Sequence, residues 1–509
     1  MAHRRSFLKT IILASGAVFS ASLESCTRKP SEIRPVRSSS RRTYDGQKFA
    51  TAHAYLRDGA PLPPPDLTYR TDVIVVGAGP SGLMAAIDLE SAGRGVIVLD
   101  SEPRAGGAAV SADILGGSVP LGSVYFVEST EEVRRMLSYA AIEPVPCPDD
   151  GYDFGEGEVV RNLWSDATLR RVIRNESDRD GMMRFRDDLL ALGDALPVYP
   201  LKTADTTQRN QLDQPVDKWL AQYRSPTLRT IIESYSRSSM GGNISRTNVY
   251  CLQNFYVSEF GPEFGGGRQT FPGGMARLTQ GVASKLKDVR TNMLVARVGQ
   301  GAEGVWVDAV DDQGRVHKIV AADVIMAVPK FQIPRLLTDC SPQRAAACRS
   351  LEYAPYMTLH VASSKPLVER DIYDTWNLRS EFETDVVNPS AVPSTSYSKN
   401  ICSLFVPMEQ WMRGQLQNEE LFARRAAEIV DRFLSTRTDE QRASVETVYC
   451  WAWGHSIVVP TPGSHSEAAL AASLGEGRIV FAHTDNDAAP ALENALWHGA
   501  EAARTVLAR

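Results

Sequence analysis

The chain has 509 residues, of which 43% are hydrophobic and 23% charged, and its formal net charge at pH 7 is −6. This length suffices for one large domain, or two closely connected ones, with a sizeable core. The slightly acidic balance gives no basis for nucleic-acid binding, which needs a basic surface. The eight histidines are scattered and no CxxC pair occurs, so the sequence predicts no metal site.

The first 26 residues have the pattern of an export signal. Arg4-Arg5-Ser6-Phe7-Leu8-Lys9 resembles a twin-arginine motif, and the apolar run after it, residues 10–23, is shorter than the ~20 residues that span a bilayer. Cys26 ends a sequence similar to a lipobox, which predicts acylation there, with simple cleavage nearby as the alternative. We therefore expect a periplasmic or cell-envelope protein that is exported folded and held at the membrane by a lipid anchor on Cys26. The competing interpretation is an ordinary buried helix that begins with two arginines.

Residues 27–70 are rich in Arg, Ser and Pro, and Pro61 and the run 63–65 stiffen their second half. This composition predicts an extended linker between the anchor and the folded body. Packing of the part around Tyr55 and Leu56 on the domain surface is the alternative.

Residues 73–100 then read as a strand, a glycine turn, a helix and a second strand that ends in an acid. Gly77 allows the tight turn, Gly79 leaves room for a pyrophosphate, and Gly82 lets the helix pack closely on the sheet. The adjacent Ser81 opens the helix, whose N-terminus favours negative charge. Asp100 is placed to accept hydrogen bonds from ribose hydroxyls. This spacing predicts a dinucleotide site.

Further glycine motifs follow, and together they resemble the flavin-containing amine oxidase superfamily over nearly the whole chain beyond residue 70. The first is Arg104-Ala105-Gly106-Gly107, continued by Gly122-Ser123. The other matching blocks are residues 271–278, 327–329, 477–485 and 490–503.

The resemblance implies an α/β fold in which a Rossmann-like FAD-binding domain is interleaved with an α+β substrate domain. It assigns residues 71–162, 268–330 and 475–509 to the first and residues 163–267 and 331–474 to the second. In chain order, periodicity predicts helices within 163–257, strands at 293–298, 304–310 and 317–328, strands at 356–361 and 401–406, and helices at 420–434 and 491–507.

The resemblance also implies cofactor contacts beyond the first motif. Val295 matches a strand residue facing the adenine, Asp485 lies at or beside a carboxylate that contacts the ribityl–pyrophosphate region, and Leu492 opens the last helix against the pyrimidine ring. A helix N-terminus there stabilises the anionic reduced flavin. Two departures, Ala108 and Glu102 in place of arginines, remove charges that would face the phosphates.

The catalytic residues are less clearly marked. Many amine oxidases carry a lysine on a strand near the flavin, and here Thr358 falls at that place, which predicts a dehydrogenase with an acceptor other than oxygen. His455 and His483 are the acid–base candidates because histidine titrates near neutrality, and a structural role is the alternative for each. Trp451 and Trp453 are expected either to form a wall of the substrate site or to pack in the core.

We therefore expect an FAD-dependent oxidoreductase that moves a hydride from a small amine, with polyamines as one candidate class, to flavin N5. Its expected partners are that amine and an electron acceptor in the envelope. One alternative is dehydrogenation of an amino acid or of a carbon–carbon bond on the same fold. The other is a flavin-binding envelope protein without turnover, because fold alone does not fix function.

Overall fold

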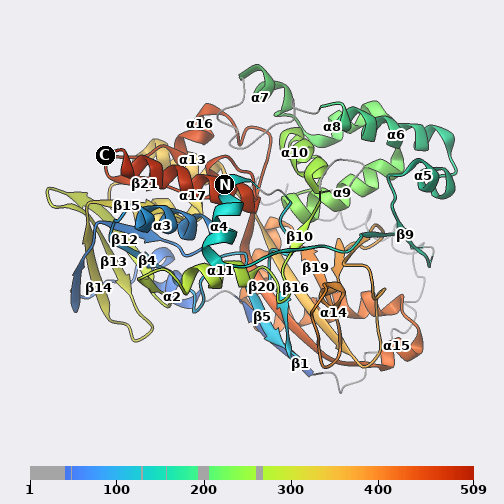
Figure 1. Cartoon of the computed structure of the whole chain (residues 1–509), viewed down its shortest axis with the longest axis horizontal. Helices are drawn as coiled ribbons and strands as arrows, with labels where there is room; N and C mark the ends of the chain where they lie inside the picture. The colour runs from blue at the N-terminus through green and yellow to red at the C-terminus, as the bar shows by residue number, and fades with distance from the viewer. Residues whose placement is uncertain (1–40, 47–48, 128–129, 156, 193–205, 260–266) are drawn as a thin grey trace, which may run out of the picture. The chain divides into compact units, whose positions relative to one another are not determined.

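The computed structural model describes residues 41–46, 49–127, 130–155, 157–192, 206–259 and 267–509, all within one unit, Arg41–Arg509 (Figure 1). The predicted signal, 1–26, and Cys26 lie outside the described residues. Among the helices of the described ranges, none is long and apolar enough to cross a membrane.

A five-stranded parallel sheet carries the first glycine motif. Its inner strands β3 (Val73–Val76) and β4 (Val96–Leu99) are buried along their whole length, which explains their unbroken apolar sequences. In spatial order the strands are β11 (Val289–Arg290), β4 (Val96–Leu99), β3 (Val73–Val76), β15 (Asp323–Met326) and β21 (Ile479–Phe481).

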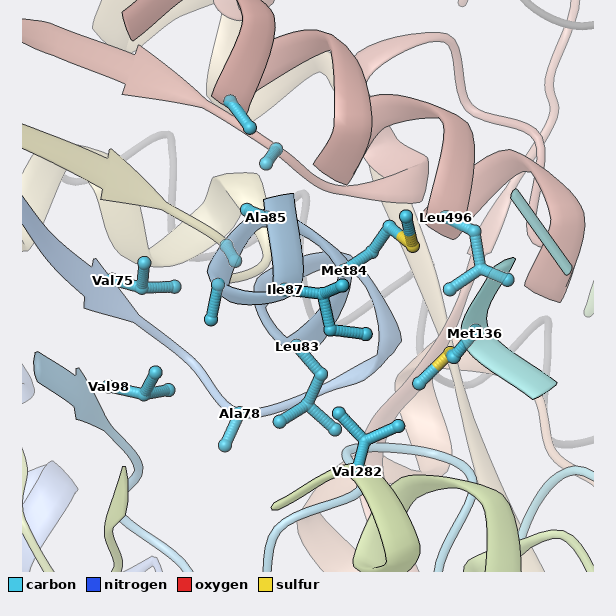
Figure 2. Close-up of a cluster of buried hydrophobic side chains, with 14 of the residues drawn as sticks. Val75, Ala78, Leu83, Met84, Ala85, Ile87, Val98, Met136, Val282 and Leu496 are labelled. Carbon is cyan, nitrogen blue, oxygen red and sulfur yellow. The ribbon is translucent and has the colours of Figure 1, made fainter. Parts of the chain in front are cut away.

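Helices cover one face of this sheet and share a core with it. The first helix after the glycine turn, α3 (Pro80–Ser91), packs against the last helix of the chain, α17 (Leu492–Leu507). The close approach needs Gly499, since a Cβ there would lie 2.2 Å from the carbonyl oxygen of Ser81. Figure 2 shows Leu83 and Met84 of α3 in the same cluster as Leu496 of α17. The cluster also includes residues of α4 (Glu131–Ala140) and α11 (Ala276–Ala283).

A smaller four-stranded sheet shares a second buried cluster with the parallel sheet. It consists of β12 (Leu294–Gly301), β13 (Gly304–Val310), β14 (Val316–Ala321) and β2 (Leu67–Arg70), antiparallel except where β2 joins β14. The strands predicted at 293–298 and 304–310 are confirmed. The single strand predicted at 317–328 is two strands, β14 and β15, which belong to different sheets.

Most of the rest of the described chain forms an eight-stranded mixed sheet and helices, and two two-stranded sheets complete it. The sheet order is β1 (Arg41–Gly46), β20 (Val445–Val459), β16 (Glu352–Ser363), β19 (Asn400–Pro407), β18 (Asp385–Val387), β17 (Asp374–Asn377), β8 (Gly151–Asp153) and β9 (Val159–Arg161). The helices are α5 (Asp166–Val172), α6 (Glu176–Leu190), α7 (Thr206–Leu212), α8 (Val216–Leu220), α9 (Pro226–Met240), α10 (Val249–Glu259) and α14 (Glu419–Ser435). The strands and helices predicted in these ranges are therefore confirmed, and so is the mixed α/β class.

The predicted linker, residues 27–70, is folded over most of its described part. β1 pairs with β20, and β2 pairs with β14. Between them, Ala50–Arg57 is helical, and Leu56 packs against the cluster beneath the four-stranded sheet. The apolar residues of this segment gain more from burial than an extended tether offers, so the proline run serves only as the loop before β2.

Two predicted domain boundaries also differ from the structure. β8 and β9 fall inside the predicted FAD-binding range 71–162, yet β8 pairs with β17 of the eight-stranded sheet. Conversely, the segment after Pro329, with α12 (Ile333–Leu336) and α13 (Pro342–Ser350), packs on the four-stranded sheet. The pairing of β8 with β17 joins residues far apart in sequence, so local pattern does not reveal it.

Candidate active site

The turn between β3 and α3 has no room for side chains at two of its glycines. Gly77 has φ +105°, and a Cβ there would lie 2.4 Å from the carbonyl oxygen of Ala327. A Cβ on Gly82 would lie 1.9 Å from the carbonyl oxygen of Gly77. Gly79 differs, because the nearest atom to its added Cβ is 3.7 Å away and it borders a cavity. The missing side chain of Gly79 thus leaves open space at the N-terminus of α3, where phosphate oxygens are best stabilised.

Asp100 anchors the same turn from the end of β4. Its carboxylate accepts from the amides of Ala78 at 2.7 Å and Glu102 at 2.9 Å, and burial raises its pKa. A carboxylate has about four acceptor positions, so two bonds leave capacity for ribose hydroxyls. Asp100 borders the cavity, as the dinucleotide prediction requires.

The second glycine pair, Gly106 and Gly107, lies next to the turn that carries Gly79. A Cβ on Gly107, at φ +55°, would lie 3.1 Å from the Cα of Gly79, and Gly107 lines the cavity. Gly106 donates instead to the carbonyl of Ala78 from outside the lining. Arg104 does not line the cavity either, since it donates to the carbonyl of Ser111. Gly106 and Arg104 can therefore act on a ligand only indirectly, through the hydrogen bonds that hold this loop in place.

The remaining predicted cofactor residues line the same cavity, except Gly82, which packs beneath the turn. Ser81 uses its hydroxyl to donate to the carbonyl of Ala495 on α17, which ties the first and last helices together. The lining members are Gly77, Gly79, Ser81, Asp100, Gly107, Gly122, Ser123, Val295, Asp485 and Leu492.

The cavity has a volume of about 650 Å³ and continues from this cradle to one face of the eight-stranded sheet. Trp453 donates to the carbonyl of Leu121 at 2.6 Å, and Thr358 donates to the same oxygen at 3.3 Å. These bonds fix the loop that carries Gly122 against the sheet. Trp453 and Thr358 line the cavity, whereas Trp451 packs in the same apolar cluster as Trp453 but does not line the cavity.

His455 lines the cavity as a neutral, stacked ring. Its imidazole lies on Phe331 with centroids 4.0 Å apart and an angle of 18°. Burial, reinforced by the charge of Arg413, lowers the pKa of His455 to about 3. The ring is therefore neutral near neutral pH, with one N–H donor and one acceptor nitrogen, and does not serve as a general acid.

His483 belongs to a separate polar cluster at the cavity edge. Its Nδ1 lies 2.9 Å from a carboxylate oxygen of Asp485, whose other oxygen accepts from the Tyr353 hydroxyl at 2.5 Å and the Lys330 amide at 2.9 Å. Burial alone would raise the pKa of Asp485, but His483 and the Lys330 ammonium bring it down to about 2. Asp485 is therefore an ionised group that holds the loop before α17 in place.

Sequence reasoning missed Asp385, a buried carboxylate in the cavity wall. Its Oδ1 accepts from the hydroxyls of Ser238 at 2.7 Å and Thr384 at 2.6 Å. Burial raises its pKa to about 6. No local motif marks it, because β18 and α9 meet only in the tertiary structure.

The alternative prediction, that the part around Tyr55 and Leu56 packs on the domain, is confirmed, but sequence reasoning missed that this segment also forms a wall of the cavity. Phe49, His53, Leu56 and Arg57 line the cavity. Across the described ranges, no group of His, Cys, Asp and Glu side chains is arranged to hold a metal ion.

A parallel sheet with this glycine cradle, and a long cavity that leads from it to a second sheet, define a dinucleotide-binding oxidoreductase. Residues 80–507 match the family described as flavin containing amine oxidoreductase, and the chain belongs to that family. The glycine cradle and Asp100 fit its cofactor, which is FAD.

Individual relatives share low sequence identity with this chain or match only a short part of it. A Mycobacterium tuberculosis protein named as a flavin-containing monoamine oxidase, AofH, is 24% identical over 274 residues, which are 51% of this chain and 57% of that protein. The putrescine oxidase of Kocuria rosea is 39% identical over 72 residues, 14% of this chain and 15% of that one. A structure of a putrescine oxidase bound to putrescine superposes with a TM-score of 0.66 at 20% identity, covering 87% of this chain and all of the other. That likeness establishes a shared fold.

Proposed function

We propose that this protein oxidises a small amine at the carbon next to its nitrogen, with FAD taking the hydride. The observation that carries the proposal is the single cavity that joins the dinucleotide cradle to the buried aromatic face of Tyr356, Phe405 and Trp453. When bound, FAD would supply a ring that accepts a hydride, which is two electrons and one proton. The relatives named as amine and putrescine oxidases support an amine as the substrate.

The chain's own residues bind and orient the amine and exclude water. Tyr356, Phe405 and Trp453 are all buried and present aromatic surface, which suits the carbon chain of an amine and, face on, its cation. Neutral His455 cannot protonate the nitrogen near neutral pH. An amine bound with a free lone pair needs no further base.

We also propose that the electron acceptor is not oxygen. Thr358 occupies the place where the family resemblance leads one to expect a lysine, and its hydroxyl is bonded to the carbonyl of Leu121. Among the described residues that line the cavity, none is a lysine. The fully buried Lys330 lies behind Asp485 instead. Because the site has no lysine near the flavin to promote the reaction with oxygen, we infer a dehydrogenase that passes its electrons to another carrier.

The place of action follows from the first 26 residues alone. The twin-arginine pattern supports export of the folded protein with FAD already bound, and the lipobox-like sequence supports an anchor on Cys26. The carrier would then be a component of the cell envelope.

The test is to add amines, diamines and amino acids to the purified holoenzyme without oxygen and follow the flavin absorbance. Bleaching by amines, with slow recovery in air and fast recovery with an artificial acceptor, is the expected result. Bleaching by amino acids alone would favour the amino-acid alternative. A flavin that no donor reduces would contradict turnover.

A further inference from the structure

The part of the cavity wall that belongs to the predicted FAD-binding ranges carries acids but neither lysine nor arginine. Its carboxylates are those of Asp100, Glu102, Asp485 and Glu493. Among the described lining residues none is a lysine, and every arginine comes from outside those ranges. FAD adds the negative charge of its pyrophosphate, which the N-terminus of a helix stabilises only in part. Any lysine or arginine that balances this charge therefore belongs to another segment.

Three arginines line the cavity in the described chain, Arg57, Arg335 and Arg413. Arg413 is committed to the eight-stranded sheet. Its Nε donates to the carbonyl of Gly454 at 2.7 Å, and its Nη2 donates to the carbonyl of Tyr353 at 2.6 Å. These bonds tie β20 to β16, which leaves Arg57 and Arg335 as the arginines available to an anion.

Arg335 lies on α12 with most of its donors unused by protein groups. Its Nη1 donates to the carbonyl of Phe331 at 3.0 Å, and within the described residues it forms no ion pair. A guanidinium has five N–H donors in a planar fork, which matches two oxygens of a phosphate. The side chain is exposed at the edge of the cavity, so it is free to turn towards a ligand.

Arg57 belongs to the N-terminal segment and has a partly compensated charge. Its Nε lies 2.7 Å from a carboxylate oxygen of Asp58, and its Nη1 lies 3.0 Å from Nδ1 of His53. Burial, followed by the charge of Arg57 and a smaller contribution from Arg335, lowers the pKa of His53, while Asp58 acts in the opposite direction. Both guanidiniums are therefore near the same neutral ring.

This pair of arginines lies at the dinucleotide end of the cavity. Leu56, the neighbour of Arg57, packs in the same buried cluster as Val295 of β12 and Leu336 of α12. Leu56, Val295 and Leu336 all line the cavity. The charge of Arg57 and Arg335 is thus next to the strand on which the adenine end of FAD is expected, rather than at the sheet face that carries Trp453.

We propose that Arg335, assisted by Arg57, binds the pyrophosphate of FAD, so that the N-terminal segment Phe49–Arg57 is part of the cofactor site. Ala108 and Glu102 line the same cavity at positions where the family resemblance leads one to expect arginines. In this chain the positive charge comes instead from two segments outside the parallel sheet. The inference concerns the cofactor alone and does not depend on which substrate is oxidised.

The experiment removes FAD from the purified protein and titrates the apoprotein with FAD at low and at high ionic strength. Binding is measured by calorimetry and by the change in flavin fluorescence. Arg335→Gln and Arg57→Gln remove one charge each and keep a polar side chain, whereas Arg335→Lys keeps the charge. Arg349→Gln is the matched control, because Arg349 is an exposed arginine of the neighbouring α13 that does not line the cavity.

We expect Arg335→Gln to weaken FAD binding about tenfold at low ionic strength, as for the loss of one hydrogen bond to a charged group. Arg57→Gln should weaken it by about threefold, because Asp58 already offsets part of that charge. Arg335→Lys should stay within about threefold of the wild type, and Arg349→Gln should change nothing. Salt should weaken binding more in the wild type than in Arg335→Gln. Urea unfolding of the apoproteins verifies that each variant is folded.

Wild-type affinity for FAD in a folded Arg335→Gln protein would overturn the inference. A loss in Arg335→Gln that is as large at high as at low ionic strength would also overturn it, because it would indicate packing and not charge. Unchanged FAD affinity together with weaker binding of amino acids to the holoenzyme would assign this cation to the substrate instead. Flavin reduction by amines tests the proposed function separately, so the two can fail independently.

Discussion

The two ends of the cavity are built in different ways. At the cradle, Gly77, Gly79 and Asp100 lie within 24 residues of one another, and the local strand, turn and helix set their positions. At the sheet face, Thr358, Asp385 and Trp453 come from three strands, and their positions depend on strand register. The cradle is thus specified locally and suits a cofactor common to a whole family. The sheet face is specified by long-range pairing and is free to differ in substrate between members.

The largest effect is expected from alanine substitutions at two cradle glycines: Gly82, which is needed for packing, and Gly79, which leaves space for the ligand. Gly82→Ala places a Cβ 1.9 Å from the carbonyl oxygen of Gly77, so it should lower the free energy of unfolding by about 3 kcal/mol and abolish FAD retention. Gly79→Ala meets its nearest atom only at 3.7 Å, so the apoprotein should unfold as the wild type does while FAD content falls. The measurements are urea unfolding of the apoproteins and flavin absorbance per protein.

Gly414→Ala is the control for that comparison, because nothing lies within 4 Å of its added Cβ. It should change neither quantity. Wild-type FAD content in Gly79→Ala would contradict the placement of the pyrophosphate at this turn.

A second prediction uses the acidity of Asp385 to probe the sheet face. Burial, aided by the Asp150 charge, raises its pKa to about 6, while Thr384, Ser238 and Arg268 act in the opposite direction. The carboxylate forms as the pH rises through 6, so the affinity for a cationic amine should increase by up to tenfold per pH unit from pH 5 to 6 and level off above about 7. Titrations of the oxidised holoenzyme measure this, and Asp385→Asn should be flat over the same range.

The same group makes stability depend on pH with a definite sign. The folded state holds the Asp385 proton more tightly than the unfolded chain, whose ordinary value is 3.8. Its contribution to the free energy of unfolding should therefore decrease as the pH rises from about 4 to about 6. The difference between wild type and Asp385→Asn in urea unfolding isolates that contribution, and a constant difference across this window would contradict the raised pKa.

The smallest expected effect concerns His455. Because its pKa is lowered to about 3 and its ring stacks on Phe331, we expect a packing role. His455→Phe should keep the rate of flavin reduction within about threefold, whereas His455→Ala should cost about 1 kcal/mol of stability from the lost stacking. A large loss of rate in His455→Phe, with a changed pH profile, would instead identify it as an acid–base residue.

The helices and most strands were predictable from periodicity, since burial of one face imposes a spacing that the sequence displays. The folded structure of the segment predicted as a linker was not predictable. The pairing of β1 with β20 joins residues about 400 positions apart, and the proline run in the same segment resembles a tether. The boundary at β8 and β9 differed from prediction for the same reason, because β8 pairs with β17.

The sequence by itself determined the cradle. The glycines at 77, 79 and 82 and the acid at 100 belong to one local strand, turn, helix and strand, so their spacing along the chain fixes their relative positions. It also determined the family, through motifs that each keep their own local conformation. Only the tertiary structure decided that Asp385 faces Thr358 across Phe405 and that Leu56 closes a wall of the cavity. Side chains brought together by strand register carry no local signature, because the hydrogen bonds that align them form between segments with no fixed separation along the chain.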